Sequence, residues 1–590
     1  TFSEENKTFE KGIFTYCKIR EGQKCPPWAL QSKKIRHNTA NKTIYYDDAV
    51  LKVYDFPIFY FPILSHPDPT VKRRSGFLAP SFSSNSTVGS GFQAPYFWNI
   101  SNDKDLTFSP RLYLNENPLL LAEYRQDYAN SFLIVDAGYT KGFKKKSSKK
   151  TKGGRAHLFG KFNMSLIEEE DKNSGFEINL QRSSNNTYLK VYDIDTALVE
   201  SNINILENTF DYSYENNDIF FGANISAFEN ITIADRKKYE YLFPYLTFEK
   251  SLLESEQYGL FDLSSNLRVR NYDVNKQTEQ IVNDVKWKSN KWLNKFGLEN
   301  SFEGLLKLVN YNAENASEYK TEQNNSEISG ALGFLTKINL YKNNLTNNDI
   351  YSLTPKFLVR YAPGHMRRIN DGKLNYTNLF DLNRVNQIDV IENGLSATLG
   401  LNYKQNKYSK KGGVGDEKFS FSIGQVINEK ENKDMASSTS LDQRFSDIVG
   451  ESNFKINNKL DFNYKFALDQ NYKTLNYNEF GADFELEKTK FNISYLEEKD
   501  HIGDQEYIKT DIELSLSPSS QFGFSTRRNL KTSSAEFYNL SYDYINDCLK
   551  AGLIFRREYY TDKDIEPGNS LMFNITIVPF ANISSPSLSK

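Results

Sequence analysis

The feature that most constrains this chain is an alternation of apolar and polar residues that continues, with few breaks, from Gly76 to the C-terminus. Neighbouring side chains of a β-strand point to opposite faces, so a period of two marks a strand with one apolar face. The stretches 395–404 and 460–469 show this most clearly, with an apolar residue at every second position. Helical periodicity is nearly absent. The pattern therefore predicts an all-β fold and argues against a soluble α/β enzyme.

The length of the alternating region predicts one very large closed sheet. About 510 residues, at roughly 20 per strand and connection, give on the order of 26 antiparallel strands, since a membrane β-strand needs about 9–11 residues. The chain holds 37 tyrosines and 43 phenylalanines, yet only 38% of it is hydrophobic. That balance is typical of a transmembrane β-barrel, whose wall faces lipid on one side and water on the other. A soluble multi-domain adhesin is the alternative, but it should show regular repeats and distinct linkers.

Residues 1–65 differ from the barrel region. They contain short strand-like segments at regular spacing, too few to close a core, as expected for the C-terminal part of an elongated β-jellyroll whose earlier rungs are absent. The opening TFSEENKTFE lacks a signal-peptide pattern, so we expect a processed or truncated N-terminus. The predicted organisation is the end of a jellyroll at 1–65, a linker at 66–75, a barrel at 76–580 and a C-terminal tail at 581–590.

The cysteines and histidines suggest no catalytic or metal site. Cys17, Cys25 and Cys548 are too few and too scattered for zinc, which needs close pairs of ligands. They could form a disulfide between the two ends of the chain, with one thiol left over, or be incidental buried thiols. The five histidines are isolated, and no HExxH, CxxC, GxSxG or phosphate-loop motif stands in a suitable context. We expect no cofactor, and the net charge of −2 argues against nucleic acid as a partner.

A lysine-rich stretch, 140–155, reads TKGFKKKSSKKTKGGR and is the most charged local feature. It could be a solvated loop. It could also be an extracellular loop that meets anionic lipid headgroups, where each lysine is worth about 1 kcal/mol.

Two prolines, Pro80 and Pro95, fall inside the first two predicted barrel strands. Proline has no backbone N–H, so each removes a donor from the strand ladder. The first strand must close against the last, near 571–578, and a weakened seam there suits a lateral gate; the alternative is that the prolines only shape a bend or bulge. The predicted gate residues are Gly76, Phe77, Leu78, Pro80, Pro95, Leu571, Phe573 and Ile575.

Several motifs occur in a specific order. The segment FPIFYFP at 56–62 is followed by KRRSGFL at 72–78 and PYFWNI at 95–100, and later by LFDLNRV at 379–385 and YINDC at 544–548. These motifs resemble the linker, the first two strands and the later barrel of the LptD, or organic-solvent-tolerance, family of lipopolysaccharide-assembly outer-membrane proteins. The resemblance covers nearly the whole chain. It implies that Pro57, Pro62, Arg73 and Arg74 belong to the passage from jellyroll to barrel.

The resemblance implies a 26-stranded barrel in the Gram-negative outer membrane, with the N-terminal segment in the periplasm. Such a protein takes lipopolysaccharide from a periplasmic bridge of LptA-like jellyrolls and releases it sideways between the first and last strands, while an LptE-like lipoprotein plugs the lumen. The family also carries disulfides from its N-terminal domain to a site near the last strands, which Cys548 matches; Cys17 or Cys25 matches the distal cysteine. This chain departs from the family pattern in having one cysteine near the C-terminus instead of a pair, and in lacking most of the jellyroll.

Three functions are compatible with such a barrel. A lipopolysaccharide translocon, which is not an enzyme, is the first. A passive porin or plugged receptor-type channel is the second, but it explains neither the preceding jellyroll nor the prolines at the seam. An outer-membrane hydrolase would need a catalytic constellation on the wall, and the sequence contains none that we recognise.

Overall fold

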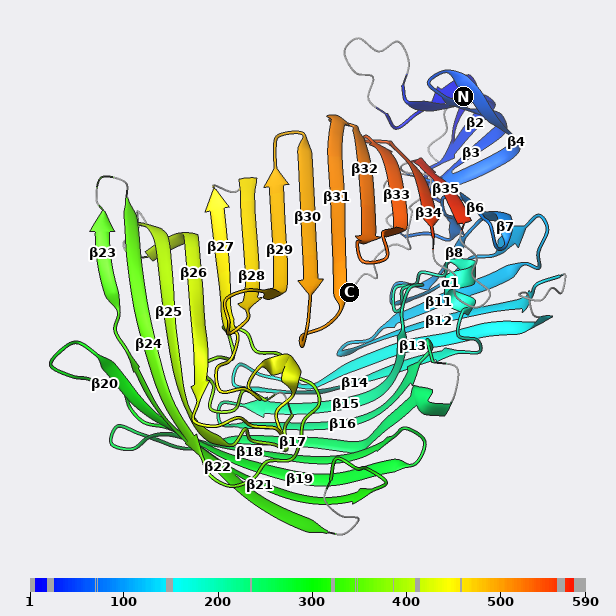
Figure 1. The fold of residues 1–590 in the computed structure, drawn as a ribbon. Helices are drawn as coiled ribbons and strands as arrows, with labels where there is room; N and C mark the ends of the chain where they lie inside the picture. Colours follow the sequence, from blue (N-terminus) through cyan, green and yellow to red (C-terminus); the bar gives the residue numbers. More distant parts are fainter. Residues whose placement is uncertain are drawn as a thin grey trace.

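A large closed β-barrel and a small separate sheet make up the protein in the computed structural model (Figure 1). The structure describes residues 6–17, 26–68, 71, 73–144, 152–233, 236–319, 324–344, 346, 348–385, 387–408, 414–456, 459–559 and 568–577. Cys25, the tail 581–590 and residues 145–151 of the lysine-rich stretch lie outside this part. Among the described residues, no helix has both the length and the apolar character needed to cross a membrane.

The small sheet is formed by the N-terminal residues. Four antiparallel strands follow one another in sequence order: β1 (Asn6–Phe14), β2 (Trp28–Asn38), β3 (Thr43–Val53) and β4 (Phe56–Pro67). One face is a small apolar core, because alternate side chains of β2 and β3 turn inward and are almost fully buried. The sheet is consistent with the end of a jellyroll, as the sequence predicts.

The barrel contains 31 hydrogen-bonded segments in one closed order. Five of them (β6, β8, β10, β20 and β23) continue the preceding segment across a break, which leaves 26 antiparallel strands and confirms the predicted fold class. The first strands are β5 (Gly76–Phe77), β6 (Ser81–Asn85), β7 (Gly89–Gln93), β8 (Tyr96–Ser101), β9 (Lys104–Phe108), β10 (Arg111–Tyr113), β11 (Leu119–Asp127), β12 (Ser131–Gly142), β13 (Lys152–Glu168), β14 (Lys172–Ser183), β15 (Ile205–Asn216), β16 (Ile219–Asn230), β17 (Tyr239–Ser255), β18 (Gly259–Tyr272), β19 (Lys276–Lys288), β20 (Trp292–Leu293) and β21 (Glu299–Glu314).

The rest of the wall follows in the same up-and-down manner. It consists of β22 (Asn325–Lys337), β23 (Leu340–Asn344), β24 (Asp349–Ala362), β25 (Gly394–Tyr408), β26 (Val414–Asn428), β27 (Ile448–Ile456), β28 (Leu460–Leu468), β29 (Leu475–Glu485), β30 (Thr489–Glu498), β31 (Gln505–Ser517), β32 (Ser520–Asn529), β33 (Ser534–Ile545), β34 (Leu549–Glu558) and β35 (Gly568–Ile577).

The period of two corresponds to the two faces of the wall. In β25, Leu395 and Leu399 are 39% and 51% exposed on the outside, whereas Ser396 and Thr398 are buried toward the interior. An apolar outer face suits lipid, and a polar inner face suits a wet lumen.

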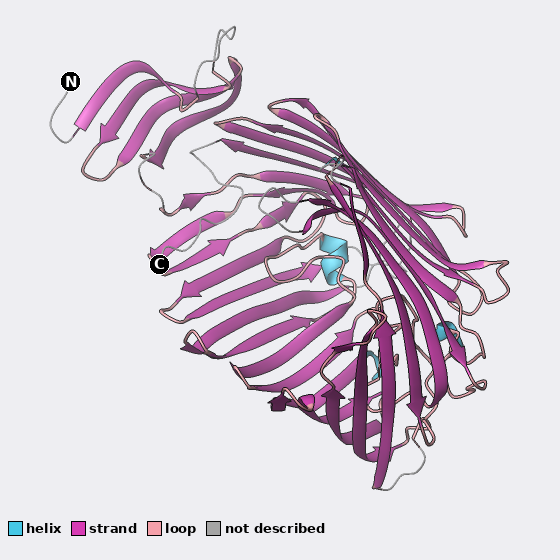
Figure 2. Ribbon diagram, turned by 90° about the vertical axis from the view of Figure 1, so that its left-hand side faces the viewer, coloured by secondary structure: helices cyan, strands magenta, loops and turns pink. Residues whose placement is uncertain are grey.

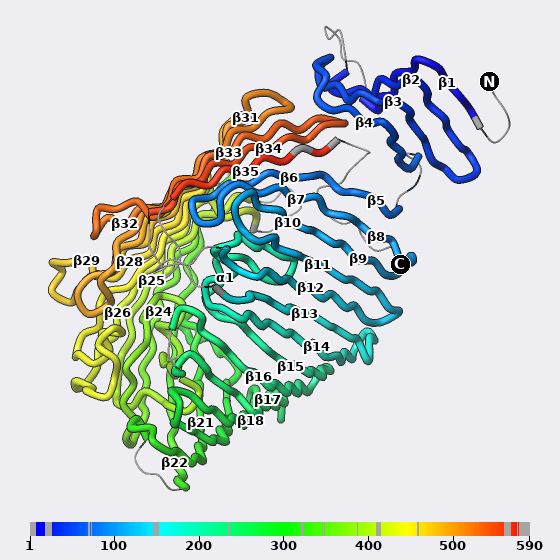
Figure 3. Tube along the Cα trace, turned by 90° about the vertical axis from the view of Figure 1, so that its right-hand side faces the viewer, coloured from blue at the N-terminus to red at the C-terminus, as the bar shows by residue number. Residues whose placement is uncertain are grey.

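The two ends of the barrel differ. The N-terminal sheet lies at one end, here called the proximal end, beside the turn that carries Cys548 (Figure 3). Three long segments leave the opposite, distal end: 184–204, which contains α1 (Tyr188–Tyr192), 363–393, and 429–447, which contains η2 (Ser437–Thr439). Figures 1 and 2 show helix-bearing segments enclosed by the strands. The short η1 (Arg236–Lys238) precedes β17.

Candidate functional site

The barrel closes at a seam between its first strand, β5 and β6, and its last strand, β35 (Figure 3). Five residue pairs join β6 to β35, from Ser81 opposite Asn574 to Asn85 opposite Ser570. Ten pairs join β35 to β34 on its other side. In the same register residues 78–80 would face residues 575–577, and no ladder pair joins these two described stretches.

Side chains add little to the closure. β6 reads Ser-Phe-Ser-Ser-Asn, and of its residues only Phe82 faces an aromatic partner, Phe573. Cross-strand side-chain pairs contribute roughly 0.2–1 kcal/mol each, and small polar residues sit low in that range. Among the described residues, the seam has fewer ladder pairs than any other contact between neighbouring strands of the wall.

A row of prolines crosses the strands next to the seam. Pro80 separates β5 from β6, Pro95 separates β7 from β8, and Pro110 separates β9 from β10. Leu78 donates its backbone N–H to the carbonyl of Pro95 at 2.8 Å, and Ala94 donates to Pro110 at 3.4 Å. In a hydrogen-bonded pair of antiparallel strands, each residue donates its N–H to the carbonyl of the other. Pro95 and Pro110 accept the first of these bonds but have no N–H with which to donate the second. Each of these two residue pairs therefore has one hydrogen bond instead of two.

The N-terminal sheet is covalently joined to the barrel on one side of the seam. Cys17 and Cys548 form a disulfide with Cα atoms 5.3 Å apart, and Cys548 lies in the turn between β33 and β34. The buried Trp28 indole donates to the Cys548 carbonyl at 2.9 Å, and the hydroxyls of Tyr54 and Tyr544 are in contact. Apolar side chains of the sheet and the turn share one buried cluster. The sheet is therefore docked on the barrel rather than merely tethered to it.

The linker prolines lie in the last strand of the sheet. Pro57 and Pro62 belong to β4, an edge strand, where a missing N–H need not break a ladder pair. The same strand exposes a row of large apolar side chains, among them Phe56 at 75% and Ile63 at 77% exposed. An apolar strand edge of this kind can meet lipid or another protein.

Segment 184–204 packs against the inner wall beside the seam. The buried α1 side chains Tyr188, Leu189 and Tyr192 contact wall residues, and Arg111 of β10 donates to the Tyr192 carbonyl. The wall residues of this cluster are Tyr113, Leu119, Phe143, Phe159 and Leu206, together with Val88 and Ile231 of the turns. These contacts tie the distal halves of several N-terminal strands into one unit, whose border is the seam.

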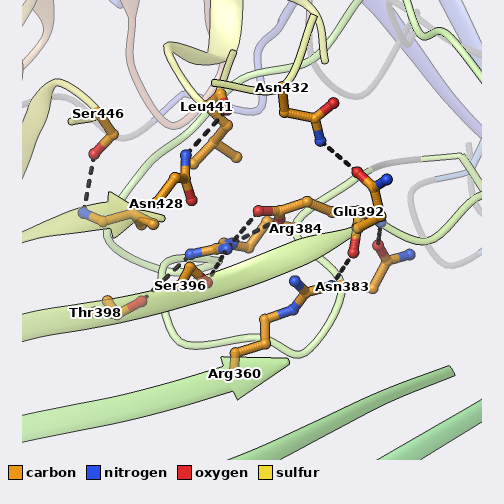
Figure 4. Close-up of polar contacts among 12 residues, drawn as sticks. Arg360, Asn383, Arg384, Glu392, Ser396, Thr398, Asn428, Asn432, Leu441 and Ser446 are labelled. Carbon is orange, nitrogen blue, oxygen red and sulfur yellow. Dashed lines mark hydrogen bonds and ion pairs between the residues drawn. The ribbon is translucent and has the colours of Figure 1, made fainter. Parts of the chain in front are cut away.

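Segment 363–393 contains a buried ion pair, Arg384 with Glu392, whose residues also contact the inner wall (Figure 4). The Arg384 guanidinium contacts both carboxylate oxygens of Glu392: Nε lies 2.8 Å from Oε2, and Nη2 lies 2.5 Å from Oε1. The Arg384 side chain is 0% exposed and that of Glu392 is 3% exposed. The same guanidinium donates to Ser396 Oγ at 3.0 Å and to Thr398 Oγ1 at 3.3 Å on β25. Arg360 of β24 donates to the Glu392 carbonyl. The ion pair is internal to the segment, and the hydrogen bonds with β24 and β25 fasten the segment to the wall.

Electrostatics favour the charged form of this pair. Burial alone would raise the pKa of Glu392, but the guanidiniums of Arg384 and Arg360 outweigh it and hold that pKa below its ordinary value. Asp389 shows the same balance, because Arg367, at 2.9 Å, and Arg268 lower its pKa against the effect of burial. Both balances favour the ionised carboxylate, so the two buried ion pairs stay charged.

Comparison with known proteins identifies the family. The family model described as LptD, LPS transport system D, matches residues 159–534. The chain belongs to the LptD family. The LPS-assembly protein LptD of Shewanella oneidensis is 40% identical over 105 residues, 17% of this chain and 14% of that protein. That of Shewanella denitrificans is 24% identical over 434 residues, 69% of this chain and 53% of that protein. The chain thus matches about half or less of the length of these curated relatives.

Solved structures share only a distant likeness. The match to the FrpB iron transporter of Neisseria meningitidis (F3-3 variant) covers 91% of this chain and 87% of the transporter chain, with 8% sequence identity and a TM-score of 0.36. Membership of the LptD family, together with the 26-stranded barrel, makes this chain an outer-membrane protein of a Gram-negative cell, as predicted.

The structure brings together several residues that the sequence singled out. Gly76, Phe77, Leu78, Pro80, Pro95, Leu571 and Phe573 lie on the two sides of the seam or at its breaks, and Ile575 lies in β35 opposite Ala551. Cys17, rather than the undescribed Cys25, pairs with Cys548. Sequence analysis missed Pro110, although its spacing of 15 residues from Pro95 repeats that from Pro80 to Pro95. It also missed the Arg384–Glu392 pair, because no sequence pattern indicates which residues a long loop will bring together.

Proposed function

We propose that this protein is an outer-membrane translocon that takes lipopolysaccharide from a periplasmic bridge and inserts it into the outer leaflet through a lateral gate. The single observation that carries the proposal is the seam: its described residues form five ladder pairs, none joins 78–80 to 575–577, and it lies beside the docked N-terminal sheet. The names and family of its relatives supply the substrate class.

The path has three parts with different chemistry. Acyl chains follow the apolar side chains of the N-terminal sheet, where contact with water is costly. The sugar and phosphate portion enters the polar lumen, and the whole lipid leaves where β6 parts from β35. The gate residues lie along this last step: Gly76, Phe77, Leu78, Pro80, Pro95, Leu571, Phe573 and Ile575.

The proposal includes two protein partners. An LptE-like lipoprotein would occupy the part of the lumen that the barrel's own segments leave open, since a wall of 26 strands encloses more space than its side chains fill. An LptA-like jellyroll would extend the N-terminal sheet by adding strands to it, because a short stack of strands leaves unpaired backbone groups at its edges.

The second candidate is a passive porin or plugged receptor-type channel. A porin needs a lumen open at both ends, whereas segments 184–204 and 363–393 are packed or ion-paired inside this one. This packing argues against an open porin, and the N-terminal sheet docked beside the seam, which a plugged receptor-type channel does not need, favours the translocon over that form of the second candidate.

Reconstitution tests the proposal. The protein, with its lipoprotein partner, is placed in liposomes and supplied from the proximal side with fluorescent lipopolysaccharide on a periplasmic bridge protein. We expect labelled lipid to reach the distal-side leaflet, where an added quencher detects it. Rapid passage of small sugars without any lipid transfer would instead support the porin.

A further inference from the structure

Two consecutive linker arginines bind opposite sides of the junction between the N-terminal sheet and the barrel. Arg73 faces the barrel: its Nη2 lies 2.5 Å from Oδ2 of Asp105 in β9, and its Nη1 donates to the carbonyl of Asn102. Arg74 faces the sheet: its Nη1 lies 3.2 Å from the carbonyl of Asn41 and contacts the hydroxyl of Thr43. We propose that Arg73 and Arg74 are positioning residues that fix the end of the sheet beneath the seam.

The contact on the barrel side is built into the wall. Asp105 is fully buried and also accepts two hydrogen bonds from Arg125 of β11, at 3.0 Å to Nε and 2.9 Å to Nη2. Arg73 itself is 8% exposed and lies over the ring of Phe97. A charge-assisted contact out of water holds its geometry far better than a surface ion pair does. Arg73 is therefore a fixed anchor in a linker that could otherwise swing.

The contact on the sheet side grips the turn between β2 and β3. Three acceptors of this turn surround the Arg74 guanidinium, namely the carbonyls of Asn41 and Lys42 and the Thr43 hydroxyl. Asp68, the residue after β4, donates its N–H to the same Lys42 carbonyl at 2.8 Å. The linker is thus fastened to the sheet before it is fastened to the barrel.

These anchors lie on the other side of the seam from the disulfide. Cys548 belongs to the turn between β33 and β34, next to β35, whereas Asp105 belongs to β9, beyond β5 and β8. The end of the sheet at Trp28 and Tyr54 contacts the first turn, and its end at Asn41–Thr43 is held by Arg74. The sheet is therefore attached to the barrel on both sides of the seam, through the Cys17–Cys548 disulfide on one side and through the Arg73–Asp105 contact on the other. With the disulfide alone, the sheet could pivot about one point.

Removing the arginines should leave the barrel intact. In Arg73→Ala, Asp105 keeps both hydrogen bonds from Arg125, so no buried carboxylate is left unpaired. In Arg74→Ala, the freed carbonyls belong to exposed residues of the turn and can bind water. The purpose assigned to the two residues rests on the proposed function, but their effect on position can be measured without transport.

The test measures the orientation of the sheet in the full-length protein in nanodiscs. One nitroxide label is placed at Lys33→Cys, exposed on β2 of the sheet, and the other at Ala129→Cys, in the exposed turn between β11 and β12 of the barrel. Pulsed electron paramagnetic resonance, in a Cys25→Ser background, measures the distance between the two labels. We expect one narrow distribution, whose width at least doubles in Arg73→Ala/Arg74→Ala with the disulfide intact. Arg73→Lys/Arg74→Lys should restore most of the narrowing, because each lysine keeps a charged donor.

Arg36→Ala is the matched control, because Arg36 lies in the same sheet, is 48% exposed and pairs with Asp47 of the sheet itself. An unchanged width in the double alanine variant, equal broadening in Arg36→Ala, or lysine variants as broad as the alanine variants would each overturn the inference. Lipopolysaccharide transfer is assayed on the same samples. If the wild type transfers none, the proposed function fails, while the distances still decide the role of the two arginines.

Discussion

Replacing Arg384 by methionine is the sharpest test of how the lumen segment 363–393 is held. Methionine has a similar length but no charge, so Glu392 would be left buried without the guanidinium that contacts both of its oxygens. Arg360 would still donate to the Glu392 carbonyl, but not to its carboxylate.

The expected cost follows from the burial of the pair. Breaking one partner of a buried ion pair costs about 3–5 kcal/mol, because the other charge stays desolvated. The lost hydrogen bonds to Ser396 and Thr398 belong to the same network, so they are not added separately. At about 1.4 kcal/mol per factor of ten, the undocked population of the segment should rise by roughly 10²-fold to 4 × 10³-fold.

Limited trypsin digestion measures that population. Cleavage after Arg367, which is buried and paired with Asp389, or after Lys373, which lies over the ring of Tyr477 in β29, requires the segment to leave the wall, and its rate follows the undocked fraction when docking is fast. Arg384→Met should speed cleavage by the same factor, and Lys430→Met, an exposed change in segment 429–447, should not. Arg384→Met/Glu392→Leu, which removes both charges, should recover most of the protection. Wild-type cleavage rates in Arg384→Met, or a double variant as sensitive as the single one, would refute the reasoning.

Three further predictions concern the lumen segment, the disulfide and the prolines next to the seam. Because the pKa of Glu392 is lowered in the folded protein, its contribution is present above the ordinary carboxyl pKa and is lost as the pH falls below about 4; hydrogen exchange of 363–393 should rise there, and Glu392→Gln should remove this dependence. Cys17→Ser should abolish the difference in electrophoretic mobility between reduced and non-reduced protein, whereas Cys25→Ser should preserve it. Pro95→Ala supplies an N–H opposite the Leu78 carbonyl and should stabilise the wall by about 1 kcal/mol while slowing export; unchanged export would count against a role for the break.

The strands and their number could be predicted because a barrel wall imposes a local rule. Every second side chain faces lipid, so Leu395 and Leu399 carry the pattern without knowledge of their neighbours. Pro80 and Pro95 could be interpreted for the same reason, since a missing N–H weakens any ladder.

The rest of the site depends on contacts between residues far apart in sequence. Arg384 appears in the sequence only as part of a family motif, and no residue near it indicates that its guanidinium will contact Glu392 and β25. Asp105 looks like one more strand aspartate until Arg73 and Arg125 converge on it. α1 has five residues, too few to show a helical period.

The central claim is that lipid leaves between β6 and β35. Ser83 and Met572 are directly opposite across the seam, so Ser83→Cys/Met572→Cys can be bridged by dibromobimane in a Cys25→Ser background. Ile554→Cys/Met572→Cys, bridged between β34 and β35, is the matched control because it leaves the seam free. We expect the bridged seam to stop delivery of lipopolysaccharide to the distal-side leaflet and the control bridge to allow it. Normal delivery through a fully bridged seam would contradict the account.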